Sequence, residues 1–194
     1  MAKLYFTYSA MNAGKSTILL QSAYNYRERG MQVMLWTSGH ARGDEAGLAE
    51  ICSRIGLKAD AHLFREGADL FEAIAARKNE GPLDAVFVDE AQFLEAGQVW
   101  QLARVADRLG VPVMCYGLRT DFQGKLFPGS AELLAIADQL REVRTICHCG
   151  RKATMTARID LEGQAVIEGE QVDTDESHYV SLCRRHWEEV TNIH

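Results

Sequence analysis

The most constraining feature of this sequence is a glycine-containing segment close to its N-terminus. Ser9–Ser16 reads SAMNAGKS and matches the phosphate-binding consensus G-x-x-x-x-G-K-[ST] at every position except the first. An apolar run at Leu4–Tyr8 predicts a strand before it, and apolar residues at helical spacing predict a helix over Ser16–Arg29. The consensus requires this order of strand, loop and helix. The segment therefore predicts a site for the phosphates of a nucleoside triphosphate.

The chemistry of the loop agrees with this prediction. Backbone N–H groups and a helix N-terminus attract an anion, Lys15 adds a full charge, and the Ser16 hydroxyl can bind Mg²⁺. The alternative is a loop that contains Gly-Lys-Ser by chance. Ser9 keeps that alternative open, because a non-glycine residue tolerates a positive φ poorly. The predicted phosphate-binding residues of the loop are Ser9, Ala10, Met11, Asn12, Ala13, Gly14, Lys15 and Ser16.

Short apolar runs and amphipathic stretches alternate in the following part of the chain. Strands are predicted at Gln32–Thr37, Ala85–Asp89 and Val111–Tyr116, and helices at Leu48–Ile55, Ala68–Arg77 and Glu95–Leu109. The strands are nearly continuous apolar runs, which is typical of parallel strands buried on both faces. The pattern predicts an α/β fold with a parallel sheet flanked by helices.

The alternation of apolar runs and amphipathic stretches ends after Tyr116. Gly117–Gly129 has the composition of a loop, followed by a predicted helix at Ala131–Gln139 and a predicted strand at Glu142–Ile146. We therefore expect two domains: a nucleotide-binding P-loop domain over residues 1–146 and a small domain over residues 147–194.

A pair of acids ends one of the predicted strands. Four apolar residues precede Asp89 and Glu90, and ligands of open α/β sheets bind at the carboxyl ends of the strands. Asp89 is predicted to hold Mg²⁺ through water, and Glu90 to act as a general base or to position a water. An apolar run that ends in an acid is common, so this prediction depends on the phosphate loop.

Cysteine and histidine form two close pairs in the C-terminal part. Cys147 and Cys149 make one pair and Cys183 and His186 the other, which is a ligand set for a structural tetrahedral Zn²⁺. The alternative is a set of unrelated side chains. His148 is a competing ligand, although adjacent residues rarely converge on one metal. The remaining thiols, Cys52 and Cys115, are expected to be small buried residues, and His40, His62, His178 and His194 to be surface or structural residues.

Charge and hydropathy exclude several classes of protein. The formal net charge is −6, and no block of Lys and Arg is present, which disfavours a nucleic-acid partner. No run approaches the roughly 20 apolar residues of a membrane span, and the N-terminus does not resemble a secretory signal. We therefore expect a cytoplasmic protein without a membrane or nucleic-acid partner, whose cysteines stay reduced.

Five motifs in a fixed order carry a resemblance to a known family. They read SAMNAGKS, VDEAQF, YGLRTDFQGKLF, CHCGRKA and YVSLCRRH. The set resembles the zinc-containing (type II) thymidine kinases, with their enterobacterial branch as the expected placement. The chain also lacks the Asn-Lys-x-Asp motif of regulatory GTPases.

The resemblance implies a reaction and a site. The γ-phosphate of ATP would pass to the 5′-hydroxyl of thymidine or deoxyuridine in nucleotide salvage, with Mg²⁺ bound, and Glu90 would be the general base. Asp89, Glu90, Ala91 and Gln92 match the acidic strand-end motif on the phosphate side. A loop called the lasso, anchored by zinc, would read the edge of the thymine base. Residues that match the thymidine pocket are Met11, Leu118, Phe122, Phe127, Val172 and Tyr179.

The resemblance also implies a homotetramer and feedback inhibition by thymidine triphosphate. Without it, Phe122 and Phe127 would be interpreted as a hydrophobic plug under a long loop. This chain departs from relatives at Asp173–Glu176, where they often carry two glycines, and around Arg42, where a preceding acid is missing. Two rival functions remain: a kinase for another deoxynucleoside, and an ATP-driven binding module.

Overall fold

A seven-stranded sheet forms the centre of the larger part of the molecule. The structure is a computed structural model that describes residues 1–39, 48–171 and 178–193. The strand order is β3-β4-β2-β5-β6-β1-β7, and every pairing is parallel except β3 with β4. The strands are β1 (Leu4–Ser9), β2 (Val33–Ser38), β3 (Leu48–Cys52), β4 (Lys58–Phe64), β5 (Ala85–Val88), β6 (Val113–Leu118) and β7 (Gln139–Glu142).

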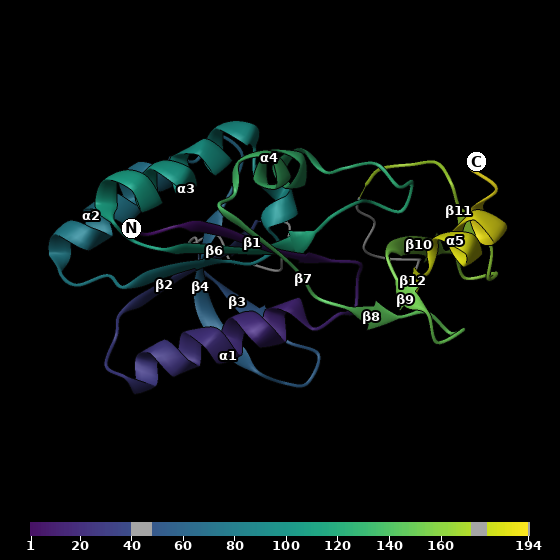
Figure 1. Ribbon diagram of the computed structural model, residues 1–194, viewed down its shortest axis with the longest axis horizontal. Helices are drawn as coiled ribbons and strands as arrows, with labels where there is room; N and C mark the ends of the chain where they lie inside the picture. Colours follow the sequence, from purple (N-terminus) through teal and green to yellow (C-terminus); the bar gives the residue numbers. More distant parts are fainter. Residues whose placement is uncertain (40–47, 172–177, 194) are drawn as a thin grey trace.

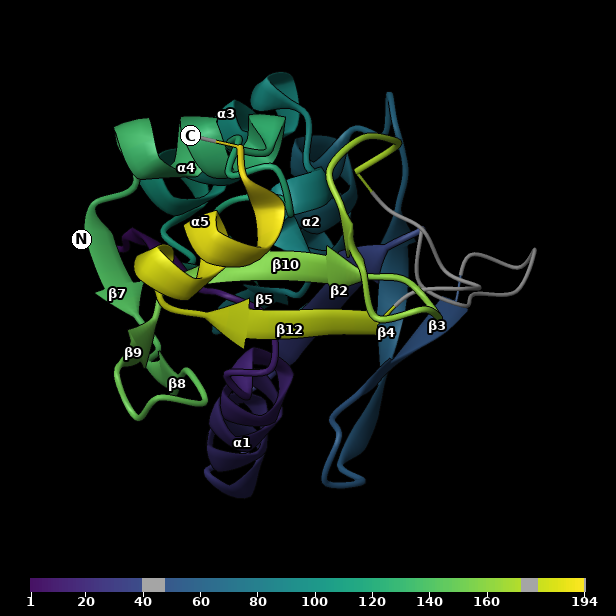
Figure 2. The ribbon, with the colours of Figure 1, turned by 90° about the vertical axis from the view of Figure 1, so that its right-hand side faces the viewer.

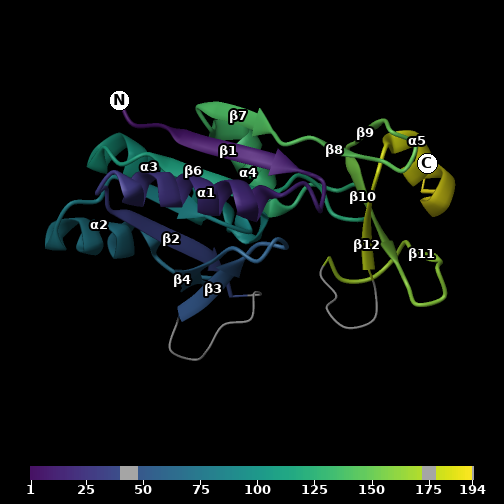
Figure 3. The same cartoon turned by 90° about the horizontal axis from the view of Figure 1, so that it is seen from below.

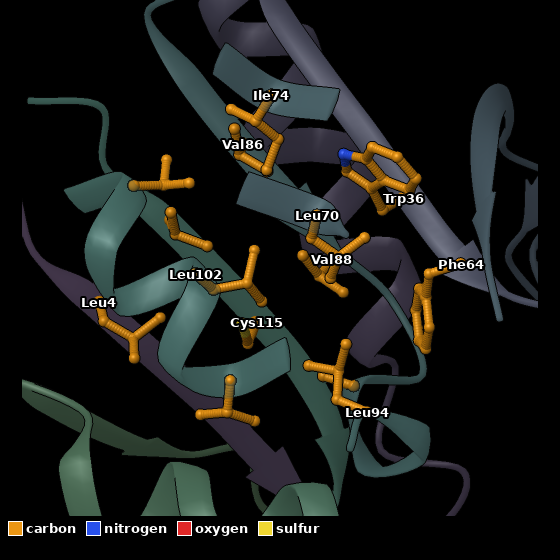
Figure 4. Close-up of a cluster of buried hydrophobic side chains, with 14 of the residues drawn as sticks. Leu4, Trp36, Phe64, Leu70, Ile74, Val86, Val88, Leu94, Leu102 and Cys115 are labelled. Carbon is orange, nitrogen blue, oxygen red and sulfur yellow. The ribbon is translucent and has the colours of Figure 1, made fainter. Parts of the chain in front are cut away.

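Helices cover both faces of this sheet, so the predicted α/β class is confirmed (Figure 1). One face carries α1 (Lys15–Glu28), and the other carries α2 (Leu70–Glu80), α3 (Ala96–Leu109) and α4 (Pro128–Ile136). Strand β5 shows why the sheet needs continuous apolar runs. Val86 and Val88 pack in the core under α2 and α3 (Figure 4), whereas Ala85 and Phe87 pack under α1.

The helix predicted at Leu48–Ile55 is wrong, because this segment forms β3 and the turn that leads into β4. Ser53 closes the turn: its N–H donates to Leu57 O at 2.8 Å, and its hydroxyl accepts from Leu57 N at 2.9 Å. Ile51 points into the core while Cys52 is exposed. The expectation that Cys52 is buried is therefore also wrong, because the side chains of a half-buried strand alternate between two faces.

The elements after β6 differ in position from the predictions. The predicted helix at Ala131–Gln139 begins earlier, at Pro128, the first residue of α4, because proline is well suited to the first position of a helix. The predicted strand at Glu142–Ile146 is divided into β7 and the short β8 (Thr145–Ile146), which pairs with β9 (Lys152–Ala153).

A second, antiparallel sheet lies at the carboxyl ends of the parallel strands (Figure 3). Its order is β11-β10-β12, from β10 (Met155–Ile159), β11 (Ala165–Val166) and β12 (His178–Leu182). The last helix, α5 (Arg184–Thr191), packs on this sheet beside β10 (Figure 2), and its Trp187 is the centre of a separate small core. Among the described helices, none is long and apolar enough to cross a membrane.

Candidate active site and metal cluster

The phosphate loop connects the end of β1 to the start of α1, as predicted. Its left-handed residues are Asn12, with φ of 63°, and Gly14, with φ of 83°; Ser9 is not among them. The Ser9 hydroxyl instead accepts a hydrogen bond from Lys15 Nζ at 3.1 Å and donates to Ala10 O at 2.6 Å. A serine at the first consensus position thus causes no backbone strain and orients the lysine.

The loop lines a cavity of about 350 Å³. Burial lowers the pKa of Lys15, and the nearby carboxylates of Asp89 and Glu90 oppose that shift. Arg54, in the turn between β3 and β4, also lines the cavity and favours the neutral lysine through its own charge. Two basic side chains facing one cavity make it suitable for an anion with several charges. Arg54 lies outside the motifs that are recognisable in the sequence.

Asp89 directly follows β5 and lies close enough to Lys15 for its charge to act on the lysine. Its side chain is buried, and burial raises its pKa to about 7, with the Glu90 charge adding to the effect. A hydrogen bond with Ser16 opposes the shift. The Oδ1 atom has no hydrogen-bond partner among the described residues. A buried, unpartnered carboxylate oxygen next to a serine hydroxyl fits a Mg²⁺ site, because Mg²⁺ prefers oxygen ligands and would compensate the buried charge.

Glu90 has an unusual backbone conformation, with φ of 51° and ψ of 38°. The amide of Gln92 holds its carboxylate: Nε2 donates to Glu90 Oε2 at 2.5 Å, while Oε1 accepts from Leu118 N at 3.0 Å. This contact requires Gly117, since a Cβ atom there would lie 2.9 Å from both Gln92 N and Gln92 Oε1. The orientation of Glu90 is therefore determined by β6 through the buried Gln92.

A second cavity of about 220 Å³ adjoins the first, and Met11, Glu90 and Leu118 line both. Its walls combine apolar rings with a few polar groups, as in sites for small molecules. The buried Asp121 is one of these groups: its Oδ1 accepts from the backbone N–H groups of Gln123 and Lys125, both at 2.9 Å, and its Oδ2 accepts from Gln171 Nε2 at 2.9 Å. Because Glu90 lines both cavities, its carboxylate can take a proton from a ligand in one cavity while that ligand attacks a second ligand in the other.

The predicted metal ligands converge beside the small core around Trp187, where Cys183 directly follows β12. One ligand atom each from Cys147, Cys149, Cys183 and His186 lies within 4.8 Å of all the others. The Cys147 Sγ atom is 3.2 Å from His186 Nδ1, and Cys149 Sγ is 3.9 Å from Cys183 Sγ. His148 is not part of this set, and its ring stacks on that of His186 at 4.3 Å. Three cysteines and one histidine at this spacing suggest a zinc site with no open position.

The charge state of Cys147 is suited to a metal ligand. Desolvation opposes its ionisation, but hydrogen bonds from the backbone at Cys149 and Cys183, together with His186, lower its pKa to about 5. Metals bind the thiolate form of cysteine. By contrast, Cys115 is buried in the core, as expected, and burial raises its pKa far above the ordinary value.

This chain combines three features: a phosphate loop, a carboxylate residue that lines two cavities, and a cluster of zinc-type ligands. The sequence model of the family described as "Thymidine kinase" matches residues 2–187. This chain belongs to the thymidine kinase family. The thymidine kinase of Mesorhizobium japonicum is 65% identical over 189 residues, covering 97% of this chain and 92% of the relative.

Further thymidine kinases match over their whole length. That of Agrobacterium fabrum is 62% identical over 193 residues, covering 99% of each chain, and that of Idiomarina loihiensis is 54% identical over 194 residues, covering 100% of each. The relatives from Mesorhizobium and Agrobacterium are alphaproteobacterial and do not support the enterobacterial placement expected from the motifs. Motifs that identify the thymidine kinase family do not by themselves distinguish its branches.

The structure brings together most residues that the thymidine kinase resemblance assigned to the nucleoside pocket. Met11, Leu118, Phe122, Phe127 and Tyr179 all line the smaller cavity. Phe122 and Phe127 are buried and form its wall, so they do not merely plug a loop. Val172, together with Arg42 and the segment Asp173–Glu176, lies outside the described residues.

Of the strand-end residues, Gln92 lines the smaller cavity as well, whereas Ala91 is buried in the core. Lining residues that the sequence analysis did not identify are Phe93, Thr120, Asp121, Thr156 and Gln171. Asp121 is part of the YGLRTDFQGKLF motif, so its place in a motif was the available signal. Thr156 and Gln171 lie in a stretch whose path across the cavity is not evident from local pattern.

Proposed function

We propose that this chain transfers the γ-phosphate of ATP to the 5′-hydroxyl of thymidine, and of deoxyuridine, giving the 5′-monophosphate for nucleotide salvage. The observation that carries the proposal is the place of Glu90, which lines both the phosphate cavity and the smaller apolar cavity. Identities of 54–65% to thymidine kinases over nearly the whole chain support the same substrate.

In this proposal the phosphate loop binds the donor. The backbone of Met11–Ser16 surrounds the phosphates, and Lys15, oriented by Ser9, neutralises their charge. Asp89 and Ser16 would hold Mg²⁺, which would neutralise part of the phosphate charge during the transfer. The unpartnered Oδ1 of Asp89 supports this assignment.

The acceptor occupies the smaller cavity. Phe122, Phe127 and Met11 provide flat and apolar surface for a base, and Leu118 closes the side next to the phosphates. Tyr179 and Val172 belong to the proposed lasso. Glu90 takes the proton of the 5′-hydroxyl as that oxygen attacks the γ-phosphorus, and Gln92 keeps its carboxylate in position.

The remaining expectations complete the proposal. Zinc held by Cys147, Cys149, Cys183 and His186 is structural and anchors the proposed small domain, residues 147–194, beside the P-loop domain, residues 1–146. Membership of the thymidine kinase family supports a homotetramer, feedback inhibition by thymidine triphosphate and a place in the cytoplasm. The net charge of −6 supports the absence of a nucleic-acid partner.

Incubation of the protein with Mg-ATP and a panel of nucleosides tests the proposal. Release of ADP that depends on thymidine is the expected result. Release without any dependence on a nucleoside would reject the kinase in favour of an ATP-driven binding module. A clear preference for deoxycytidine or deoxyadenosine would keep the chemistry and reject the substrate.

A further inference from the structure

The antiparallel pair of strands β10 and β12, called the β10–β12 pair below, has two faces of different character. Alternate residues of both strands, among them Ala157 and Leu182, pack with Trp187 in the small core that also contains two of the metal ligands. The residues between them face the other way. Of these, Thr156 and Tyr179 line the smaller cavity. The β10–β12 pair therefore contacts the metal cluster with one face and the proposed active site with the other.

Two hydroxyl groups on the second face bind one residue of the phosphate loop. Thr156 and Ser181 are directly opposite each other in the ladder. The backbone N–H of Met11 donates to Thr156 Oγ1 at 3.2 Å, and the Ser181 hydroxyl donates to Met11 O at 2.5 Å. These partners lie 145 and 170 positions from Met11 in the sequence. The loop residue between the two sites is thus held by a part of the chain outside the phosphate motif.

The next residue of the loop, Asn12, is also bound by the β10–β12 pair. The Asn12 side chain donates through Nδ2 to Tyr179 O at 3.3 Å. Asn12 has a φ of 63°, in the left-handed region that is unfavourable for non-glycine residues. Contacts at Met11 and at Asn12 therefore stabilise a loop conformation that would otherwise compete with others.

We propose that Thr156 and Ser181 are positioning residues of the phosphate loop, and that through Met11 they couple binding of the donor to binding of the acceptor. The inference rests on the proposed function for the identity of the two ligands. Its physical basis is that Met11 lines both cavities. A ligand in the smaller cavity contacts Met11, Thr156 and Tyr179, so it orders the β10–β12 pair and the loop together. The second ligand then binds to a loop that is already ordered.

Ser181→Ala is the primary test, because Ser181 binds Met11 O but is not among the residues that line either cavity. Loss of one hydrogen bond predicts a rise of roughly 3- to 10-fold in the Kd for Mg-ATP, measured by calorimetry without a nucleoside. With the β,γ-imido analogue of ATP as donor, so that no phosphate is transferred, the factor by which saturating thymidine tightens binding of the donor should fall towards one. His178→Ala, at an exposed position of the same strand, is the matched control and should leave both values unchanged.

Thr156→Val and Thr156→Ser provide an independent pair. Valine has nearly the same shape but no acceptor for the Met11 N–H, so it should weaken ATP binding, whereas serine keeps a hydroxyl and should restore it. Zinc content and Tm of every variant establish that the β10–β12 pair is intact. If Ser181→Ala loses zinc, the comparison of Thr156→Val with Thr156→Ser decides whether the inference holds. ATP binding and coupling equal to those of the parent in both Ser181→Ala and Thr156→Val would overturn the inference.

The two proposals fail in different ways. If the parent protein does not phosphorylate thymidine, the proposed function is rejected, whereas the effect of Ser181→Ala on ATP binding alone still measures the positioning of the loop. If the parent is an active thymidine kinase and Ser181→Ala binds ATP with unchanged affinity and coupling, only the further inference is rejected.

Discussion

Replacement of Gly129 by alanine tests the close packing behind Glu90. Gly129 is the second residue of α4 and is buried. A Cβ atom there would lie 2.6 Å from Ala91 O and 2.7 Å from Leu94 O. Since ordinary Cβ contacts begin near 3.4 Å, α4 and the turn that follows Glu90 must separate by up to about 0.8 Å, the difference between 2.6 and 3.4 Å.

The expected change in the free energy of unfolding of Gly129→Ala follows from two opposing effects. Alanine is otherwise favoured over glycine in a helix by about 0.5–1 kcal/mol, but overpacking of a close contact costs about 1–3 kcal/mol. The partner atoms are backbone carbonyls, which cannot turn away as a flexible side chain can. We therefore expect a net loss of about 1–2 kcal/mol in the free energy of unfolding. For a chain of this size, Tm should fall by roughly 2–8 °C.

Gly97→Ala is the matched control, because Gly97 is the second residue of α3, is exposed, and has no described atom within 4 Å of the place that a Cβ atom would take. Its Tm should equal or slightly exceed that of the parent. Thermal unfolding and kinase assays of both variants provide the measurement, and kcat of Gly129→Ala should also fall because the displaced turn carries Gln92. Equal Tm values for the two variants would refute the packing argument.

Four further predictions concern the site. Glu90→Gln should lower kcat by about 100-fold or more with little change in ATP affinity, and a near-normal kcat would contradict its role as the base. Burial raises the pKa of Asp89 from 3.8 to about 7, so its protonated form stabilises the metal-free fold at low pH and this contribution is lost as the pH rises towards 7. The Tm of Asp89→Asn relative to the parent should therefore increase between about pH 4 and pH 7, and a constant difference would contradict the assignment. Arg54→Ala should raise the KM for ATP about 3- to 10-fold, whereas Ile55→Ala, which removes an uncharged side chain from the wall of the same cavity, should not; equal effects would refute a charge contribution. Removal of zinc by a chelator should lower Tm and abolish activity together, and a metal content far below one zinc per chain in active protein would reject the cluster as a zinc site.

The parts of the fold that could be predicted are those in which local chemistry determines local structure. The phosphate loop combines an apolar strand, a glycine and a helix start within a short segment, so its place between β1 and α1 follows from the sequence. The acids after β5 and the four metal ligands are recognisable in the same way. In each case, residue type and spacing along the chain contain most of the necessary information.

The parts that could not be predicted depend on contacts between distant segments. The Leu-Ala-Glu-Ile-Cys segment of β3 fits a helix as well as a strand, and its antiparallel pairing with β4 decides the outcome. Thr156 reaches Met11 across 145 positions, and Gln171 reaches Asp121 across 50. No spacing rule covers such pairs, because they depend on how the antiparallel sheet is placed against the parallel one.

Under the proposed function, stability and activity make opposite demands on Glu90, because its backbone is left-handed. This conformation, with φ of 51°, costs a non-glycine residue about 1–2 kcal/mol. Glycine at this position would relieve the strain and remove the carboxylate. Selection for heat resistance alone would therefore favour loss of catalysis here, and directed evolution of a more durable enzyme must screen for turnover at the same time.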